Sequence, residues 1–123
     1  MAIQSHRDLQ VWQKAMEMVL QVYRVSQKFP KEEMYGLTSQ LRRAAVSVPA
    51  NIAEGNARPT RKDYANFLGI ARASLMEAET LLLIAMRLGY APEQECQSLL
   101  AGLDEISRML NALRNRLTST MQA

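Results

Sequence analysis

The chain has 123 residues, of which 48% are apolar and 6% aromatic, with a formal net charge of +3, one cysteine and one histidine. This length fits a single domain, residues 1–123, and the abundance of Leu, Ala and Met favours helix over strand. Cys96 alone forms no internal disulfide, and His6 alone excludes His-cluster metal sites and most Ser-His or Cys-His catalytic arrangements. We therefore expect a non-enzymatic protein with no cofactor and no metal.

The first two helical segments are predicted at about 8–28 and 37–54. In the first, Leu9, Trp12 and Met16 begin an apolar stripe with the three-and-four spacing of a helix, and Asp8 is placed as its N-cap. The second has a similar stripe but contains Pro49, which removes a backbone hydrogen bond. A kink at Pro49 is therefore expected.

The third and fourth segments are predicted at about 60–88 and 92–118. Thr60, followed by Asp63, makes a start typical of a capping box. The fourth segment carries a heptad seam with no missing position, formed by Cys96, Leu99, Leu103, Ile106, Leu110, Leu113 and Leu117. Four long helices joined by short links predict an all-α, antiparallel, up-down-up-down four-helix bundle.

The sequence also indicates where the protein works. Its longest apolar run is the six residues 81–86, far below the roughly 20 residues of a membrane span. The N-terminal residues lack the apolar stretch of a secretory signal. We expect a cytoplasmic protein with no membrane partner.

The positive charge is concentrated in the middle third of the chain. Six basic residues lie between residues 40 and 72, namely Arg42, Arg43, Arg58, Arg61, Lys62 and Arg72, against two acidic ones, Glu54 and Asp63. Arginine binds phosphate in a bidentate manner, so these six residues are candidate nucleic-acid contacts. A solvated basic loop with its flanking turns would show the same charges.

A polar stripe follows the second segment. Gln40, Arg43, Ser47, Asn51 and Glu54 are spaced by three and four residues, so they share one helix face beside the apolar stripe. This face is either simply solvated or it binds a partner or lines a subunit interface.

Extra apolar residues on the last two segments suggest self-association. Leu81, Leu83, Ile84 and Met86 on the third, and Leu100 and Met109 on the fourth, exceed the single stripe that each helix of a bundle buries. The alternatives are a contact between copies of the chain, which would multiply the basic charge around one axis, and a generous core.

The motifs resemble those of a known family. They include Val11-Trp12-Gln13-Lys14-Ala15, Phe29-Pro30, Tyr35-Gly36-Leu37, Ser47-Val48-Pro49-Ala50-Asn51-Ile52-Ala53-Glu54-Gly55 and Leu88-Gly89-Tyr90. Over about Asp8 to Tyr90 the chain is similar to the bacterial four-helix bundle proteins encoded in 23S rRNA intervening sequences. It departs from them at Asn56-Ala57-Arg58, where a Gly-Arg pair is more frequent, and at Ala73, where Gly is frequent.

The resemblance implies a homo-oligomer, with pentameric rings expected, and association with ribosomal RNA or another nucleic acid. The accessory variability determinants of diversity-generating retroelements are a related family and form similar basic rings. No catalytic residues come with the resemblance. The competing hypothesis is a protein–protein adaptor or scaffold. In it a protein partner docks on the polar stripe and on the apolar residues of the third and fourth segments, and the basic charge is incidental.

Overall fold

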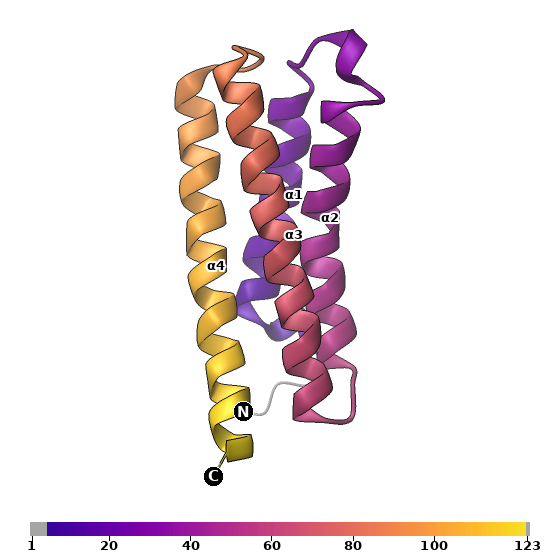
Figure 1. Ribbon diagram of the computed structural model, residues 1–123, viewed down its shortest axis with the longest axis vertical. Helices are drawn as coiled ribbons and strands as arrows, with labels where there is room; N and C mark the ends of the chain where they lie inside the picture. Colours follow the sequence, from indigo (N-terminus) through magenta and orange to yellow (C-terminus); the bar gives the residue numbers. More distant parts are fainter. Residues whose placement is uncertain (1–4, 123) are drawn as a thin grey trace.

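The computed structural model describes residues 5–122 and consists of four long helices (Figure 1). They are α1 (Gln10–Ser26), α2 (Leu37–Asn56), α3 (Arg61–Arg87) and α4 (Glu93–Gln122), with short 3-10 turns at His6–Asp8 and Lys31–Glu33. The described residues contain no strand. The bundle is therefore all-α, as predicted, and residues 1–4 and 123 of the predicted domain lie outside the described residues.

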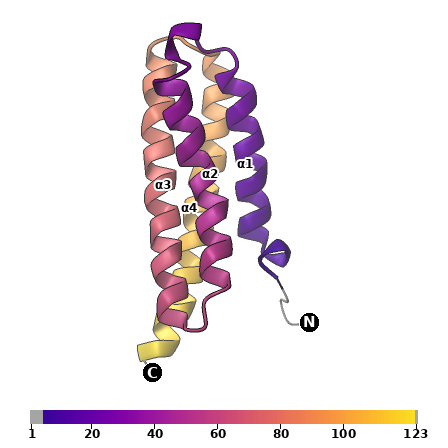
Figure 2. The same cartoon turned by 90° about the vertical axis from the view of Figure 1, so that its right-hand side faces the viewer.

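The topology is up-down-up-down. Each helix packs against its neighbour in the chain, and α4 closes the bundle by packing against α1. Two views show that the α2–α3 turn, the start of α1 and the end of α4 lie at one end of the bundle, while the other two connections lie at the opposite end (Figures 1 and 2). The closest packing is between α2 and α3.

Local sequence explains where the helices begin and end. Thr60 has extended backbone and its Oγ1 accepts a hydrogen bond from the Asp63 N–H at 3.1 Å, which confirms the predicted start of α3. The placement of Asp8 as an N-cap is wrong, because Asp8 belongs to the first 3-10 turn and Leu9 precedes α1 without a side-chain cap. α2 continues through Pro49, and a kink there stays a prediction.

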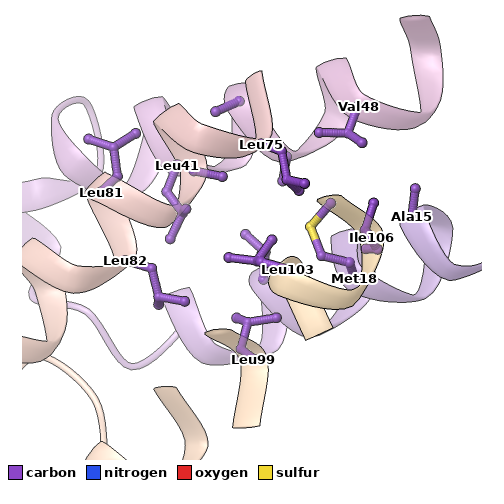
Figure 3. Close-up of a cluster of buried hydrophobic side chains, with 14 of the residues drawn as sticks. Ala15, Met18, Leu41, Val48, Leu75, Leu81, Leu82, Leu99, Leu103 and Ile106 are labelled. Atoms are coloured by element: carbon purple, nitrogen blue, oxygen red, sulfur yellow. The ribbon is translucent and has the colours of Figure 1, made fainter. Parts of the chain in front are cut away.

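The core is built from the predicted stripes. Leu41, Val48, Leu75, Leu82 and Leu103 are fully buried in the layer between the four helices, together with most of the α4 heptad seam (Figure 3). Burying a leucine or valine side chain contributes about 1.5–3 kcal/mol, so this layer supplies much of the favourable free energy of folding.

The extra apolar residues on α3 and α4 mostly belong to this core. Leu81 is buried, and Leu83, Met86, Leu100 and Met109 are half-buried, so only Ile84 of the predicted set is exposed. These positions therefore fit a generous core, and self-association stays a prediction. α3 packs against both α2 and α4, so its apolar residues are covered from two sides.

Candidate nucleic-acid interface at one end of the bundle

The α2–α3 turn places three of the predicted basic residues together. α2 ends at Asn56 and α3 begins at Arg61, so Arg58 lies in the turn and Arg61 and Lys62 lie in the first turn of α3. The N-terminus of an α-helix carries a partial positive charge, which adds to the charge of these side chains.

Arg58 is held by two contacts at this end. Its Nη2 donates to Glu54 Oε2 at 2.9 Å, and its Cζ lies 4.6 Å from the centre of the Phe67 ring. Arg61 and Lys62 are exposed and form no ion pair with any residue of the described range 5–122. Two cationic side chains at this turn therefore remain available for an anionic ligand.

The end of α4 and the start of the chain bring further basic residues to the same end. Arg114 Nε donates to the Ala65 carbonyl at 3.3 Å, and Arg116 lines a groove with Asp8 and Leu9. Arg7, Arg114 and Arg116 lie outside the charged segment that the sequence singled out. Their position at this end could have been predicted from the antiparallel order of the helices, because that order places the last turns of α4 beside the α2–α3 turn.

The whole net charge of the protein lies at this end. We define the basic end by its six basic residues, Arg7, Arg58, Arg61, Lys62, Arg114 and Arg116, and its three acidic ones, Asp8, Glu54 and Asp63. The rest of the chain contains nine basic and nine acidic residues and is neutral on balance. This end therefore carries a surplus of three positive charges, whose field attracts anions.

The other three predicted phosphate contacts lie elsewhere. Arg42 and Arg43 are in the second turn of α2, roughly 20 Å along the helix from the basic end. Arg72 shares a face of α3 with Gly69, where an added Cβ would lie 3.4 Å from Arg114 Nη2 of α4, so Arg72 lies on the side of α3 that faces α4. The six residues therefore do not form one surface.

The polar stripe of α2 is partly used within the chain. Ser47 and Ser74 hydroxyl oxygens lie 2.8 Å apart, and Asn51 Nδ2 donates to Ser47 Oγ at 2.9 Å and to the Ser47 carbonyl at 2.8 Å. Glu54 pairs with Arg58. Gln40 is exposed. At the centre of the stripe Ser47 thus contacts α3, while Gln40, Arg43 and Glu54 are exposed.

The described residues contain no group of three or more His, Cys, Asp or Glu side chains placed to hold a metal ion. Cys96 is fully buried on the α4 seam, and this burial raises the pKa of its thiol. A neutral, buried thiol acts as a small apolar side chain. None of the helices within residues 5–122 has the length and apolar content needed to cross a membrane.

The fold is that of a small all-α bundle, and its surplus positive charge lies at one end. The chain belongs to the 23S rRNA-intervening sequence protein family, whose model matches residues 7–112. A crystal structure from Bacteroides thetaiotaomicron VPI-5482, described as a protein of unknown function from the S23 ribosomal protein family, has the same fold. Its TM-score is 0.79 at 24% identity, over 85% of this chain and 97% of that one. The comparison with curated proteins finds no match.

Proposed function

We propose that this protein is a non-enzymatic, RNA-associated protein of the cytoplasm that acts as an assembly of identical copies. The observation that carries the proposal is the basic end, which holds the entire net charge of +3. The family membership supports ribosomal RNA as the polyanion, since the family is defined by proteins of 23S rRNA intervening sequences.

The contacts at the basic end favour phosphate over bases. Arg61 and Lys62 project from the first turn of α3, where the helix dipole adds to their charge. The aromatic residues nearby, Tyr64 and Phe67, are half-buried, so they offer little ring surface on which a base could stack. Binding of this kind is electrostatic and weakens as the salt concentration rises.

Assembly would strengthen this binding. The field of one copy is weak, because three surplus charges are spread over one end of a bundle. Copies aligned side by side would place their basic ends in one plane, and the resemblance implies a pentameric ring. An RNA chain that spans several basic ends would release more counterions than one that touches a single copy.

The experiment compares RNA binding by the wild-type protein and by the Arg61→Glu, Lys62→Glu double variant over a range of salt concentrations, with a 23S rRNA fragment as the probe. The matched control is Lys31→Glu with Arg87→Glu, which changes the net charge by the same amount at the opposite end. We expect the first variant to lose affinity and to lower the salt slope by about one for each lost phosphate contact.

The outcomes separate the hypotheses. Equal loss in both variants would mean that net charge alone attracts RNA and that the basic end is not the site. Absence of RNA binding by the wild type at low salt would overturn the RNA proposal. A protein partner whose binding persists at high salt and after nuclease treatment would then favour the adaptor or scaffold function.

A further inference from the structure

Exposed apolar side chains gather on two surfaces of the bundle. Six large ones lie on α1, on α2 and on the connection between them, namely Met16, Leu20, Tyr23, Met34, Tyr35 and Val46. The other three lie on α3 and its last turn, namely Ile70, Ile84 and Leu88. In the described part of the chain α4 contributes none of them. Contiguous exposed apolar surface marks contact surfaces, and the contiguous part of the first surface is the hollow described next.

The first surface is hollowed into a groove of about 580 Å³, between α1, the α1–α2 connection and α2. Tyr23, Met34, Tyr35 and Val46 supply its apolar lining, and Tyr35 is 97% exposed. We call this hollow the α1–α2 groove. It is large enough to receive several side chains from one face of a helix.

The rim of the groove is positively charged. Arg42 is fixed in place, because its Nε donates to Ser26 Oγ at 2.8 Å and its Cζ lies 4.6 Å from the centre of the Tyr23 ring. Within the described range, neither Arg42 nor Arg43 forms an ion pair with a carboxylate. The groove therefore fits an occupant that is apolar and carries a negative charge.

The second surface, on α3, is apolar and carries a negative charge. Ile70, Glu77 and Ile84 are spaced by seven residues, so they line one face of α3, and all three are exposed. We call this face the α3 ridge. It places one carboxylate between two isoleucines that lie roughly 21 Å apart along the helix.

Matching residues of the groove and of the ridge lie at the same level along the bundle axis. The Ser47–Ser74 hydrogen bond puts these residues level, and α2 and α3 run in opposite directions. Counting four residues in each direction places Arg43 level with Ala78, beside Glu77. In the same way, Ile84 is level with Leu37, next to Met34 and Tyr35.

From this match we infer that the α3 ridge of a second copy of this chain occupies the α1–α2 groove. The inference rests on the assembly in the proposed function and names its interface. A copy lying parallel at the same height would bring its Glu77 to Arg43 and its Ile84 to Met34 and Tyr35. Two grooves facing each other would instead oppose like charges, which disfavours a symmetric dimer.

The contact is heterologous, since it joins two different surfaces. Each copy has one groove and one ridge, so the contact repeats from copy to copy and closes into a ring when the rotation permits. The helices of all copies are then parallel, and every basic end lies on the same side of the ring.

The test uses one substitution in each surface. Val46 in the groove and Ile84 on the ridge are both 43% exposed, so Val46→Asp and Ile84→Asp should leave the bundle folded, which thermal unfolding followed by circular dichroism checks. Ala101→Asp on the exposed face of α4 is the matched control. Native mass is measured by light scattering for each protein alone and for equimolar mixtures.

We expect Val46→Asp and Ile84→Asp each to be monomers of 13.9 kDa under conditions where the wild type and the control assemble. Mixed together they should form a dimer of twice that mass, because the mixture contains one intact groove and one intact ridge. An intrachain role for either residue cannot produce this dimer.

Three results would overturn the inference. An assembly that survives both substitutions would place the interface elsewhere and leave the proposed function standing. An assembly lost in Val46→Asp but kept in Ile84→Asp would indicate two grooves face to face, or another element in the groove. A monomeric wild type would overturn the assembly as well, while the salt-dependent RNA measurement would still test the basic end.

Discussion

The side-chain hydroxyl of Ser47 on α2 lies 2.8 Å from that of Ser74 on α3, between two helices whose contact is mainly apolar. Asn51 donates to Ser47 Oγ at 2.9 Å, so three polar side chains form a small network between the two helices. Hydrogen-bonded groups of this kind fix the height at which two helices pack, because sliding by one turn would leave them unpaired.

Ser74→Ala should lower the free energy of unfolding by about 1 kcal/mol, because it removes one hydrogen bond while Ser47 keeps Asn51 as a partner. Urea denaturation measures this loss. The control is a double-mutant cycle with Ser47→Ala, in which the two losses should not add. Strictly additive losses would show that the two hydroxyls do not interact.

Gly55 and Gly102 should respond in opposite ways to alanine. A Cβ at Gly55 would lie 2.8 Å from Phe67 Cβ and 3.2 Å from the Tyr64 carbonyl oxygen, so α2 and α3 would have to move apart. We expect Gly55→Ala to destabilise the protein by about 1–3 kcal/mol.

Gly102 is the matched control for this substitution, since a Cβ there meets no atom within 4 Å. In the middle of α4, Gly102→Ala should raise the free energy of unfolding by about 0.5–1 kcal/mol, because alanine loses less backbone entropy. Thermal unfolding of both variants tests the pair. Stabilisation by Gly55→Ala would contradict the close approach of α2 and α3.

Arg72 should tolerate an apolar replacement. Its Nε is buried and has no hydrogen-bond partner among the described residues, and such a group costs about 1–3 kcal/mol. Arg72→Met keeps an unbranched side chain of similar helix propensity and puts an apolar Cε where the buried Nε lies. We therefore expect the free energy of unfolding to stay the same or to rise by about 1 kcal/mol.

The exposed Arg43→Met is the comparison for Arg72→Met, and it should change the stability by less than about 0.5 kcal/mol. Chemical denaturation of the two variants measures both changes in the free energy of unfolding. A clear loss of stability in Arg72→Met would show that the guanidinium of Arg72 makes a stabilising interaction.

Stability should fall in alkaline solution. The pKa of the Cys96 thiol is raised by burial, that of Tyr90 by its hydrogen bond to Glu33, and that of Lys14 by its hydrogen bond to Glu105. In each case the folded state favours the protonated form. The resulting stability is present below the ordinary pKa values, which begin at 9.0 for the thiol, and is lost as the pH rises through the folded values.

Melting temperatures measured from neutral to alkaline pH test this expectation. Tyr90→Phe, which cannot donate to Glu33, should show a shallower decline at high pH than the wild type. A melting temperature that stays constant or rises above pH 9.0 would contradict the direction of these shifts.

The sequence predicts a structural feature best where that feature depends on the residue pattern of a single helix. The unbroken α4 seam and the Thr60 cap of α3 depend on residues three or four apart, and the structure confirms both. The grouping of Arg114 with Arg58 and Arg61 depends instead on which helix ends meet in space. The same holds for the exposed apolar residues, because Leu81 and Ile84 are equally apolar and only the packing of neighbours separates them.

The placement of charge gives each molecule an electrical polarity along its longest dimension. The basic end carries the surplus, while the opposite end, over residues 27–36 and 87–95, has three basic and four acidic residues. The field of a polyanion would exert a torque on such a molecule, so the basic end would lead in an encounter with the proposed RNA ligand. In the proposed assembly, parallel copies would hold like-charged ends side by side, and a polyanion that bridges those ends would relieve their repulsion. RNA would then act as the counterion that holds the ring together, and its binding and the assembly would promote each other.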